Sequence, residues 1–183
     1  MSSHHIIRED QEPALLIADA DAAPLSVVQE LLEWSPIVII LERALPQVLN
    51  WGIKIDVVVA EASRIPTLKE ALNNQLPLKL ISCQGEEDAL STALYYVLAS
   101  KQKTVNVLSI RSLENFESFS TLELSVFQSG KRWSLIRSGV FEKWFPAGSE
   151  IHIVSQQLHE LIKAEQDGMI VLKKENAFWV AEE

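Results

Sequence analysis

The sequence predicts an α/β protein, with a parallel, doubly wound sheet that has helices on both faces, followed by a small antiparallel β portion. Short apolar runs rich in Val, Ile and Leu recur along the first 109 residues, which is typical of strands buried on both faces. Helical patterns alternate with these runs, as in a parallel α/β sheet. Past Arg111 the pattern changes to short strands at turn spacing, which indicates an antiparallel portion.

The first predicted strand covers residues 14–18 and runs into an acidic loop, residues 18–24. The loop carries Asp19 and Asp21, which either bind a metal or face water, and we expect the second because charged side chains are usually solvated. A helix that begins at Ser26 or Leu25 follows, and its apolar side is formed by Val27, Val28, Leu31 and Leu32.

The central βαβ unit spans residues 37–63. Its strands are predicted at 37–41 and 56–60, and the helix between them stops at Gly52. Ligands of parallel sheets bind outside the carboxyl ends of the strands. Glu42 and Glu61 follow these two strands, so they are the main site candidates, with solvated strand-end charges as the alternative.

The next segments repeat the alternation. We predict a helix at about 68–73, a strand at 78–82, a helix at 89–100 and a strand at 104–109. Glu86, Glu87 and Asp88 precede or begin the second of these helices, where the helix dipole favours acids, so they need no functional role.

The second half is predicted from weaker patterns. Residues 113–124 form one more helix or, in the segment TLELSVF, a strand. Short strands follow at 133–136 and 151–154, and residues 159–165 are a short polar helix or loop. A closing hairpin joins 169–172 to 178–181. We expect two domains, 1–124 and 125–183.

Composition narrows the classes of function. The chain has 183 residues, 48% hydrophobic residues and a net charge of −9, which argues against binding to nucleic acid or to an anionic membrane surface. An anionic nucleotide needs only a local basic group or a metal. A single cysteine, Cys83, excludes an intrachain disulfide and a cysteine-based zinc site. Neither a signal peptide nor a membrane-spanning run is apparent, so we expect a cytoplasmic protein.

Four short motifs follow one another in the order and spacing of a known enzyme family. They are LERA at 41–44, GIKID at 52–56, AEAS at 60–63 and EEDA at 86–89. They stand where thiamine pyrophosphokinases carry Asp-Gly-Ala, Gly-Ile-x-Pro-Asp, Gly-Asp-x-Asp-Ser and an acid followed by Thr-Asp. Residues 148–153 are similar to that family's Gly-x-x-x-Ser-Leu segment. The chain therefore resembles the thiamine pyrophosphokinase (thiamine diphosphokinase) family over most of its length, as a degenerate member.

The resemblance implies a function and a role for each of the two domains. Members of the family transfer a pyrophosphoryl group from ATP to thiamine, giving AMP and thiamine diphosphate. Strand-end aspartates hold Mg²⁺, which neutralises the developing charge. Members are typically homodimers that bind thiamine near the β domain at the dimer interface. Residues 1–124 would thus resemble the catalytic domain, and residues 125–183 a shortened thiamine-binding domain.

The departures from the family concentrate at the strand ends. Glu42 and Glu61 stand where the family has aspartate, and their longer side chains would shift a bound metal or lose a ligand. Ser63 removes the second carboxylate of the metal pair, and Ala89 removes the acid after the threonine. Arg111 alone remains of a Gly-Gly-Arg-x-Asp-His element. These changes point to a retained scaffold with a decayed or repurposed site.

Two hypotheses follow. In the first, the chain is a binding or assembly protein that retains at most a pocket for a nucleotide or a thiamine-like molecule. In the second, it is an active Mg²⁺- and ATP-dependent enzyme. Its catalytic acids would then be Glu61, Glu42 and Asp88, its metal ligands Glu61, Glu86 and Asp88, and its nucleotide-binding residues Arg111, Arg43 and Ser63. Converging acids beside an arginine favour the enzyme, and salt-bridged acids favour the scaffold.

Overall fold

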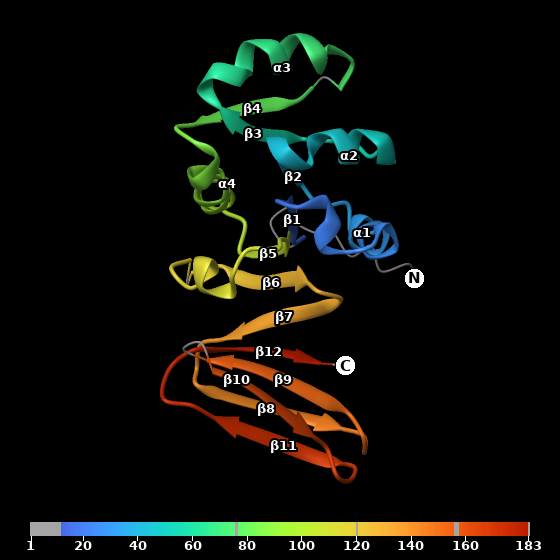
Figure 1. Ribbon diagram of the computed structural model, residues 1–183, viewed down its shortest axis with the longest axis vertical. Coiled ribbons are helices and arrows are strands. Elements are labelled where there is room, and N and C mark those ends of the chain that lie inside the picture. The colour runs from blue at the N-terminus through green and yellow to red at the C-terminus, as the bar shows by residue number, and fades with distance from the viewer. Residues whose placement is uncertain (1–11, 76, 120, 156–157, 183) are drawn as a thin grey trace, which may run out of the picture.

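The chain folds around one long sheet that runs the length of the molecule (Figure 1). The computed structural model describes residues 12–182 except 76, 120 and 156–157. Ten strands form the long sheet in the order β10-β9-β12-β7-β6-β5-β1-β2-β3-β4, and β8 and β11 form a second, two-stranded sheet. The expected mixed α/β architecture, with a large sheet and a small antiparallel one, is confirmed.

The first half contains the parallel strands. They are β1 (Ala14–Ile17), β2 (Val38–Leu41), β3 (Val57–Glu61), β4 (Lys79–Cys83), β5 (Thr104–Leu108) and β6 (Glu123–Gln128). All neighbouring pairs among these six strands are parallel. The chain moves outward from β1 to β4 and then places β5 on the other side of β1. The strand order therefore reverses between β1 and β5.

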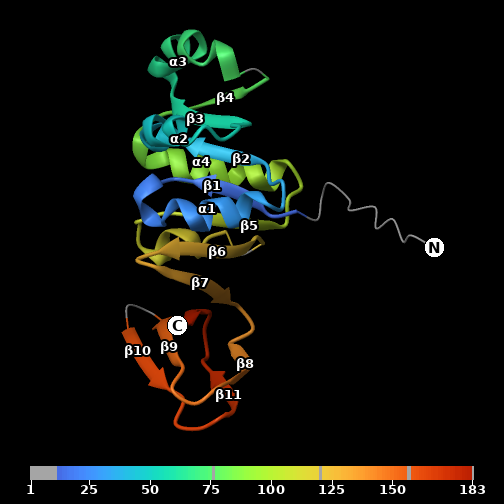
Figure 2. The same ribbon diagram turned by 90° about the vertical axis from the view of Figure 1, so that its right-hand side faces the viewer.

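Helices cover both faces of this parallel part (Figures 1 and 2). The helices are α1 (Leu25–Leu32), α2 (Leu45–Trp51), α3 (Ile65–Ala71) and α4 (Glu86–Ala99). Alternate strand residues point to opposite faces, so Leu16 and Val59 pack with α4, whereas Leu15 and Val58 pack with the other three helices. Both faces are buried, which explains the continuous apolar runs in the sequence.

The second half is antiparallel. It consists of β7 (Lys131–Ile136), β8 (Val140–Phe145), β9 (Glu150–Ser155), β10 (Leu158–Lys163), β11 (Gly168–Lys173) and β12 (Phe178–Glu182). A separate core lies between the two sheets, with Phe178 and Val180 of β12 facing Phe145 of β8. The described helices include none that is long and apolar enough to cross a membrane.

Three sequence-based predictions in this half need correction. The helical alternative for 113–124 is wrong, because Leu113–Phe116 is a single 3₁₀ turn and β6 takes up the end of the segment, as the strand alternative expects. The short helix or loop at 159–165 is wrong, because β10 pairs with β9 over Leu158–Lys163. The spacing of Leu158 and Leu161 fits a helix turn, yet both side chains are exposed on a strand.

The predicted closing hairpin is also wrong. The strand β11 pairs with β8, whereas β12 inserts between β7 and β9. Gly139 fixes this arrangement: it has a φ of +68°, and a side chain there would collide with the Lys174 carbonyl oxygen. The Lys174 amide donates to the Gly139 carbonyl at 2.8 Å. This contact ties the end of β11 to the turn before β8.

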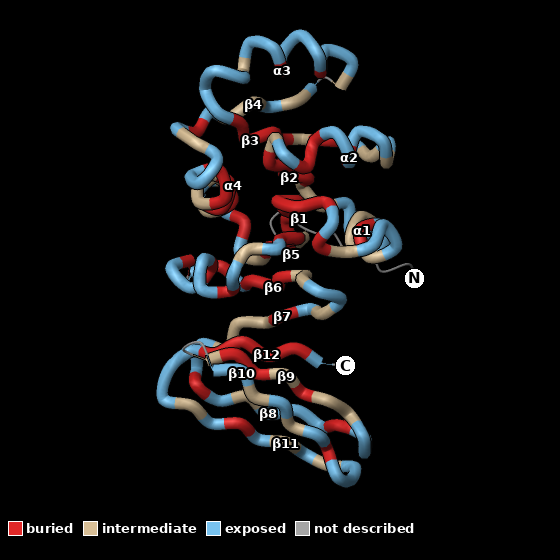
Figure 3. The backbone as a smooth tube through the Cα atoms, viewed as in Figure 1, coloured by how far each residue is buried: buried red, intermediate tan, exposed pale blue. Residues whose placement is uncertain are grey.

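The long sheet is continuous at the predicted domain boundary. Residue 125 lies within β6, which pairs with β5 on one side and with β7 on the other. One core also spans the boundary, since Trp133 and Trp179 pack with Phe116 and with residues of α4. Figure 3 shows buried residues on both sides of this point. The division into 1–124 and 125–183 stays a prediction.

Candidate functional site

A cleft of about 380 Å³ lies at the carboxyl ends of β2, β3 and β4. Its floor is apolar and includes Val59 and Ala60. Its charged residues come from the turns after these strands and from the start of α4: Glu42, Arg43, Glu61, Arg64 and Glu86. Four of the residues predicted from the sequence, Glu42, Arg43, Glu61 and Glu86, thus line one cleft, as expected for strand ends in a parallel sheet.

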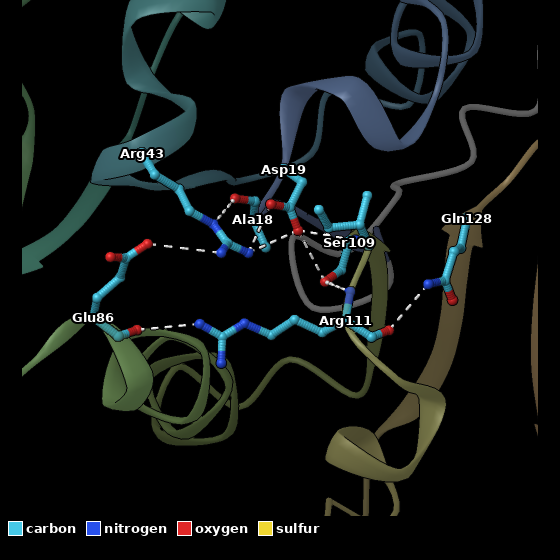
Figure 4. Close-up of polar contacts among 8 residues, drawn as sticks. Ala18, Asp19, Arg43, Glu86, Ser109, Arg111 and Gln128 are labelled. Atoms are coloured by element: carbon cyan, nitrogen blue, oxygen red, sulfur yellow. Dashed lines mark hydrogen bonds and ion pairs between the residues drawn. The ribbon is translucent and has the colours of Figure 1, made fainter. Parts of the chain in front are cut away.

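Asp19, which follows β1, is the most connected acid beside this cleft (Figure 4). One carboxylate oxygen accepts hydrogen bonds from the Ile110 amide at 2.9 Å and from the Ser109 hydroxyl at 3.2 Å. Arg43 Nη2 lies 2.7 Å from both of its oxygens. Asp19 is buried, so the expectation that it faces water is wrong. These donors replace the water that a buried carboxylate loses.

Arg43 joins three parts of the molecule. Its Nε donates to the Ala18 carbonyl at 2.9 Å, Nη2 pairs with Asp19, and Nη1 lies 3.8 Å from Glu86 Oε1. The side chain is only 28% exposed. A guanidinium held by a backbone carbonyl and two acids has little freedom to turn toward a ligand, so Arg43 has a structural role here.

The acids after β2 and β3 also have partners. Arg64 Nε donates to Glu42 Oε1 at 2.7 Å, and this hydrogen bond and charge raise the pKa of the Arg64 guanidinium above its ordinary value. The Glu61 carboxylate accepts a hydrogen bond of 2.9 Å from the Ser63 hydroxyl. Glu42 is therefore neutralised by an arginine of the neighbouring turn, and Glu61 is held by a hydroxyl.

Three further predicted residues do not line the cleft: Ser63, Asp88 and Arg111. Asp88 is exposed in the first turn of α4, where its carbonyl accepts a hydrogen bond from the Ser91 hydroxyl. Arg111 Nη2 donates to the Glu86 carbonyl at 3.4 Å. Among the described residues, no group of three or more His, Cys, Asp or Glu side chains is arranged to hold a metal ion.

Cys83 lies on the cleft at the end of β4. Burial raises the pKa of its thiol, and the negative charges of Asp88 and Glu61 raise it further. The thiol is therefore neutral at physiological pH and a poor nucleophile. This agrees with the expectation that Cys83 is a packing residue.

Ser109 and the Ile110 amide are hydrogen-bond donors to Asp19 that the sequence did not predict. They belong to the segment after β5, and they meet Asp19 because β5 lies beside β1. The signal that predicts the contact is the strand order, since polar groups after two neighbouring parallel strands share one edge of the sheet. Strand order is not apparent from the apolar runs alone.

Solved structures of thiamine pyrophosphokinases have a fold similar to that of this chain. The Bacillus subtilis enzyme has a TM-score of 0.61 at 8% identity, over 92% of this chain and 97% of that chain. The Geobacillus thermodenitrificans enzyme has a TM-score of 0.58 at 8% identity, over 92% and 96%. The Candida albicans enzyme has a TM-score of 0.57 at 11% identity, over 95% and 90%.

No protein-family model and no curated protein matches the sequence. The fold assignment rests on the solved structures. Their similarity establishes a thiamine pyrophosphokinase-like fold, which extends over both the parallel and the antiparallel parts of the chain.

Proposed function

We propose that this chain is a thiamine pyrophosphokinase-like protein that has lost Mg²⁺-dependent pyrophosphoryl transfer and acts as a binding or assembly protein. The observation that supports this proposal is the pairing of strand-end acids with arginines of the chain itself. Arg43 pairs with Asp19 and Arg64 pairs with Glu42, both at 2.7 Å. Each guanidinium binds a carboxylate oxygen that a metal ion would otherwise use as a ligand.

The physical reason is competition for the same oxygens. Mg²⁺ requires near-octahedral geometry, dehydrates reluctantly and is usually held by one or two carboxylates. Binding it at Asp19 would break an ion pair that is anchored by the Ala18 carbonyl and the Ile110 amide. Leaving a partly buried guanidinium without its acid is costly.

The cleft keeps the features of a small-molecule pocket. Its volume of about 380 Å³ and its apolar floor fall in the range of ligand pockets. It also lies outside the carboxyl ends of parallel strands, the edge at which ligands of such sheets bind, although the strand order reverses between β1 and β5 and the cleft lies over β2, β3 and β4. We propose that the cleft binds a nucleotide or a thiamine-like molecule.

An active enzyme is the second candidate, because Glu42, Glu61 and Glu86 line one cleft together with two arginines. In that case Glu61, Glu86 and Asp88 would hold Mg²⁺, with Glu42 as a further catalytic acid. Arg43, Arg111 and Ser63 would bind the nucleotide. Mg²⁺ would supply charge neutralisation for the phosphates, and the arginines would position them.

Calorimetric titration separates the two candidates. The purified chain is titrated with a non-hydrolysable ATP analogue, with and without Mg²⁺, and then with thiamine. In parallel, AMP release is assayed with ATP, Mg²⁺ and thiamine, which accepts the pyrophosphoryl group. The proposal expects no Mg²⁺-dependent nucleotide binding and no AMP. Mg²⁺-dependent binding together with AMP release would overturn it.

The Glu61→Ala variant tests the second candidate. If Glu61 holds Mg²⁺, the substitution abolishes Mg²⁺-dependent nucleotide binding, whereas Glu70→Ala on the exposed side of α3 leaves it unchanged. Unchanged binding in both variants would remove Glu61 from the site.

A homodimer is the second part of the proposal. The outer face of the β8–β11 sheet exposes Val140, Trp144, Met169 and Val171. Glu142 and Lys173 lie on the same face, so two copies related by a two-fold axis can pair opposite charges across it. We expect a dimer mass by light scattering, which Trp144→Ser lowers and Trp34→Ser, a control at a more exposed tryptophan, does not.

A further inference from the structure

A second cleft, of about 410 Å³, lies in the antiparallel part of the molecule. It is formed by β7, β8 and β12, and its lining residues are Arg132, Ser134, Phe141, Lys143, Val180 and Glu182. None of these residues lines the strand-end cleft, and none belongs to the motifs that resemble thiamine pyrophosphokinases.

Arg132 is the distinctive group of this cleft. Its Nε and Nη2 donate to one neutral oxygen, the Ser125 hydroxyl, at 3.3 and 3.1 Å. Its guanidinium carbon lies 5.8 Å from the centre of the Phe127 ring. In the described part of the chain Arg132 has no carboxylate partner, although a guanidinium offers five donors. Most of its capacity to bind an anion is therefore unused.

The charge balance of the cleft is positive. Lys143 pairs with Glu182 at 2.5 Å, so these two charges cancel and the charge of Arg132 remains. The whole chain carries a net charge of −9. The remaining surface repels anions, so a locally positive cleft is the place where a small anion can bind to this acidic protein.

The other walls restrict the kind of anion. Phe141 and Val180 supply apolar surface, and Ser134 supplies a hydroxyl. We propose that this cleft binds a small organic anion, in which Arg132 holds a carboxylate or phosphate group while an apolar part of the molecule lies against Phe141 and Val180. A planar guanidinium matches both head groups through paired hydrogen bonds.

The surroundings of Arg132 prepare it for this role. Ser125 is buried on β6, and Phe127 lies directly opposite Arg132 across the β6–β7 pair. These contacts hold the guanidinium in place before a ligand arrives, which reduces the entropy lost on binding. The positive charge of Lys143 also attracts an anion, but the ion pair between Lys143 and Glu182 weakens this attraction.

The experiment follows the Arg132 Nε signal of the full chain by ¹⁵N NMR during titration at low salt. The probes are benzoate, acetate and inorganic phosphate. We expect a saturable shift of this signal with benzoate or phosphate, and tighter binding of benzoate than of acetate because the apolar walls contribute. A preference between benzoate and phosphate identifies the head group.

Four variants test the assignment, and their affinities are compared through the backbone amide signal of Ser134, which lines the cleft and is present in every variant. Arg132→Gln should weaken binding at least about tenfold, and Arg132→Lys should weaken it less, because the charge stays and the paired geometry is lost. Glu182→Gln should tighten binding a few-fold, since it releases Lys143. Lys103→Gln, at an exposed lysine before β5 and outside the cleft, should change nothing. Circular dichroism checks that each variant is folded.

The proposal is overturned by either of two results. The first is the absence of a saturable shift with every probe. The second is equal weakening by Arg132→Gln and Lys103→Gln, which would mean that anions respond only to total charge.

Discussion

The two clefts use their arginines in opposite ways. At the strand ends, Arg43 and Arg64 each donate to a carboxylate of the same chain. In the antiparallel part, Arg132 donates to a neutral serine. A guanidinium paired with a carboxylate holds the protein together, whereas a guanidinium bonded to a hydroxyl keeps its charge available for an anion. The fold alone therefore does not indicate which cleft binds a charged ligand.

Burial explains why the two arrangements differ. Asp19 is almost fully buried, and its charge is tolerable there only because Arg43 and two further donors surround it. Arg132 is exposed, so water solvates its remaining donors and the protein tolerates it without an acid. Asp19 therefore requires its ion pair with Arg43, whereas Arg132 does not require an acidic partner.

The largest expected effect is that of Asp19→Ala. The substitution leaves Arg43 and the Ile110 amide without their acceptor, so we expect the free energy of unfolding to fall by about 3 kcal/mol. Urea denaturation measures the loss. The control is Asp21→Ala, at an exposed acid two residues away, with a change of at most about 0.5 kcal/mol. Equal effects of the two substitutions would contradict a structural role for the Asp19–Arg43 pair.

The second largest effect is expected from Ser125→Ala, beside the cleft of the antiparallel part. Ser125→Ala removes the hydroxyl that holds Arg132, and we expect a loss of about 1 kcal/mol in stability together with weaker binding of benzoate or phosphate. In the Arg132→Gln background, Ser125→Ala should cause no further loss in binding. A full loss in that background would show that Ser125 acts independently of Arg132.

A third prediction concerns the pH dependence of stability that Cys83 causes. Burial raises the pKa of this thiol, so in the pH range between its ordinary and its raised pKa the unfolded chain has lost the proton that the folded chain keeps. The free energy of unfolding should therefore fall as the pH rises through that range. Cys83→Ala should remove this slope.

Asp88→Asn tests the electrostatic part of the same shift. The charge of Asp88 helps to raise the pKa of Cys83, so alkylation by iodoacetamide should begin at lower pH in this variant. Glu87→Gln, an exposed neighbour, is the control. An unchanged alkylation profile in Asp88→Asn would leave burial and the charge of Glu61 as the causes of the shift.

The smallest expected effect is that of the Glu42–Arg64 pair. Arg64 is 56% exposed, and exposed ion pairs contribute little to stability because water and salt screen them. A double-mutant cycle with Glu42→Gln and Arg64→Gln should give a coupling well below the effect of Asp19→Ala, and 1 M NaCl should remove it. A coupling as large as that of the Asp19 site would mean that the two pairs are equivalent.

The sequence by itself determined the elements of the first half. Apolar runs of four or five residues are unambiguous when both faces of a strand are buried, and the structure places β1, β2, β3 and β5 within one or two residues of them. Gly52, at a φ of +67°, ends α2 as expected. The placement of Glu42 and Glu61 at strand ends also follows from local sequence, because it depends only on where each run stops.

Only the tertiary structure decided how the second half pairs and what the site residues contact. The strands β8, β10 and β11 are exposed on one face, so their weak patterns also fit a helix or a hairpin. Asp19 meets Ser109 and Ile110 across 90 and 91 residues, and Arg64 meets Glu42 across 22. Strand order brings these groups together. An apolar run predicts that a strand is buried, but it carries no information on which strand lies beside it.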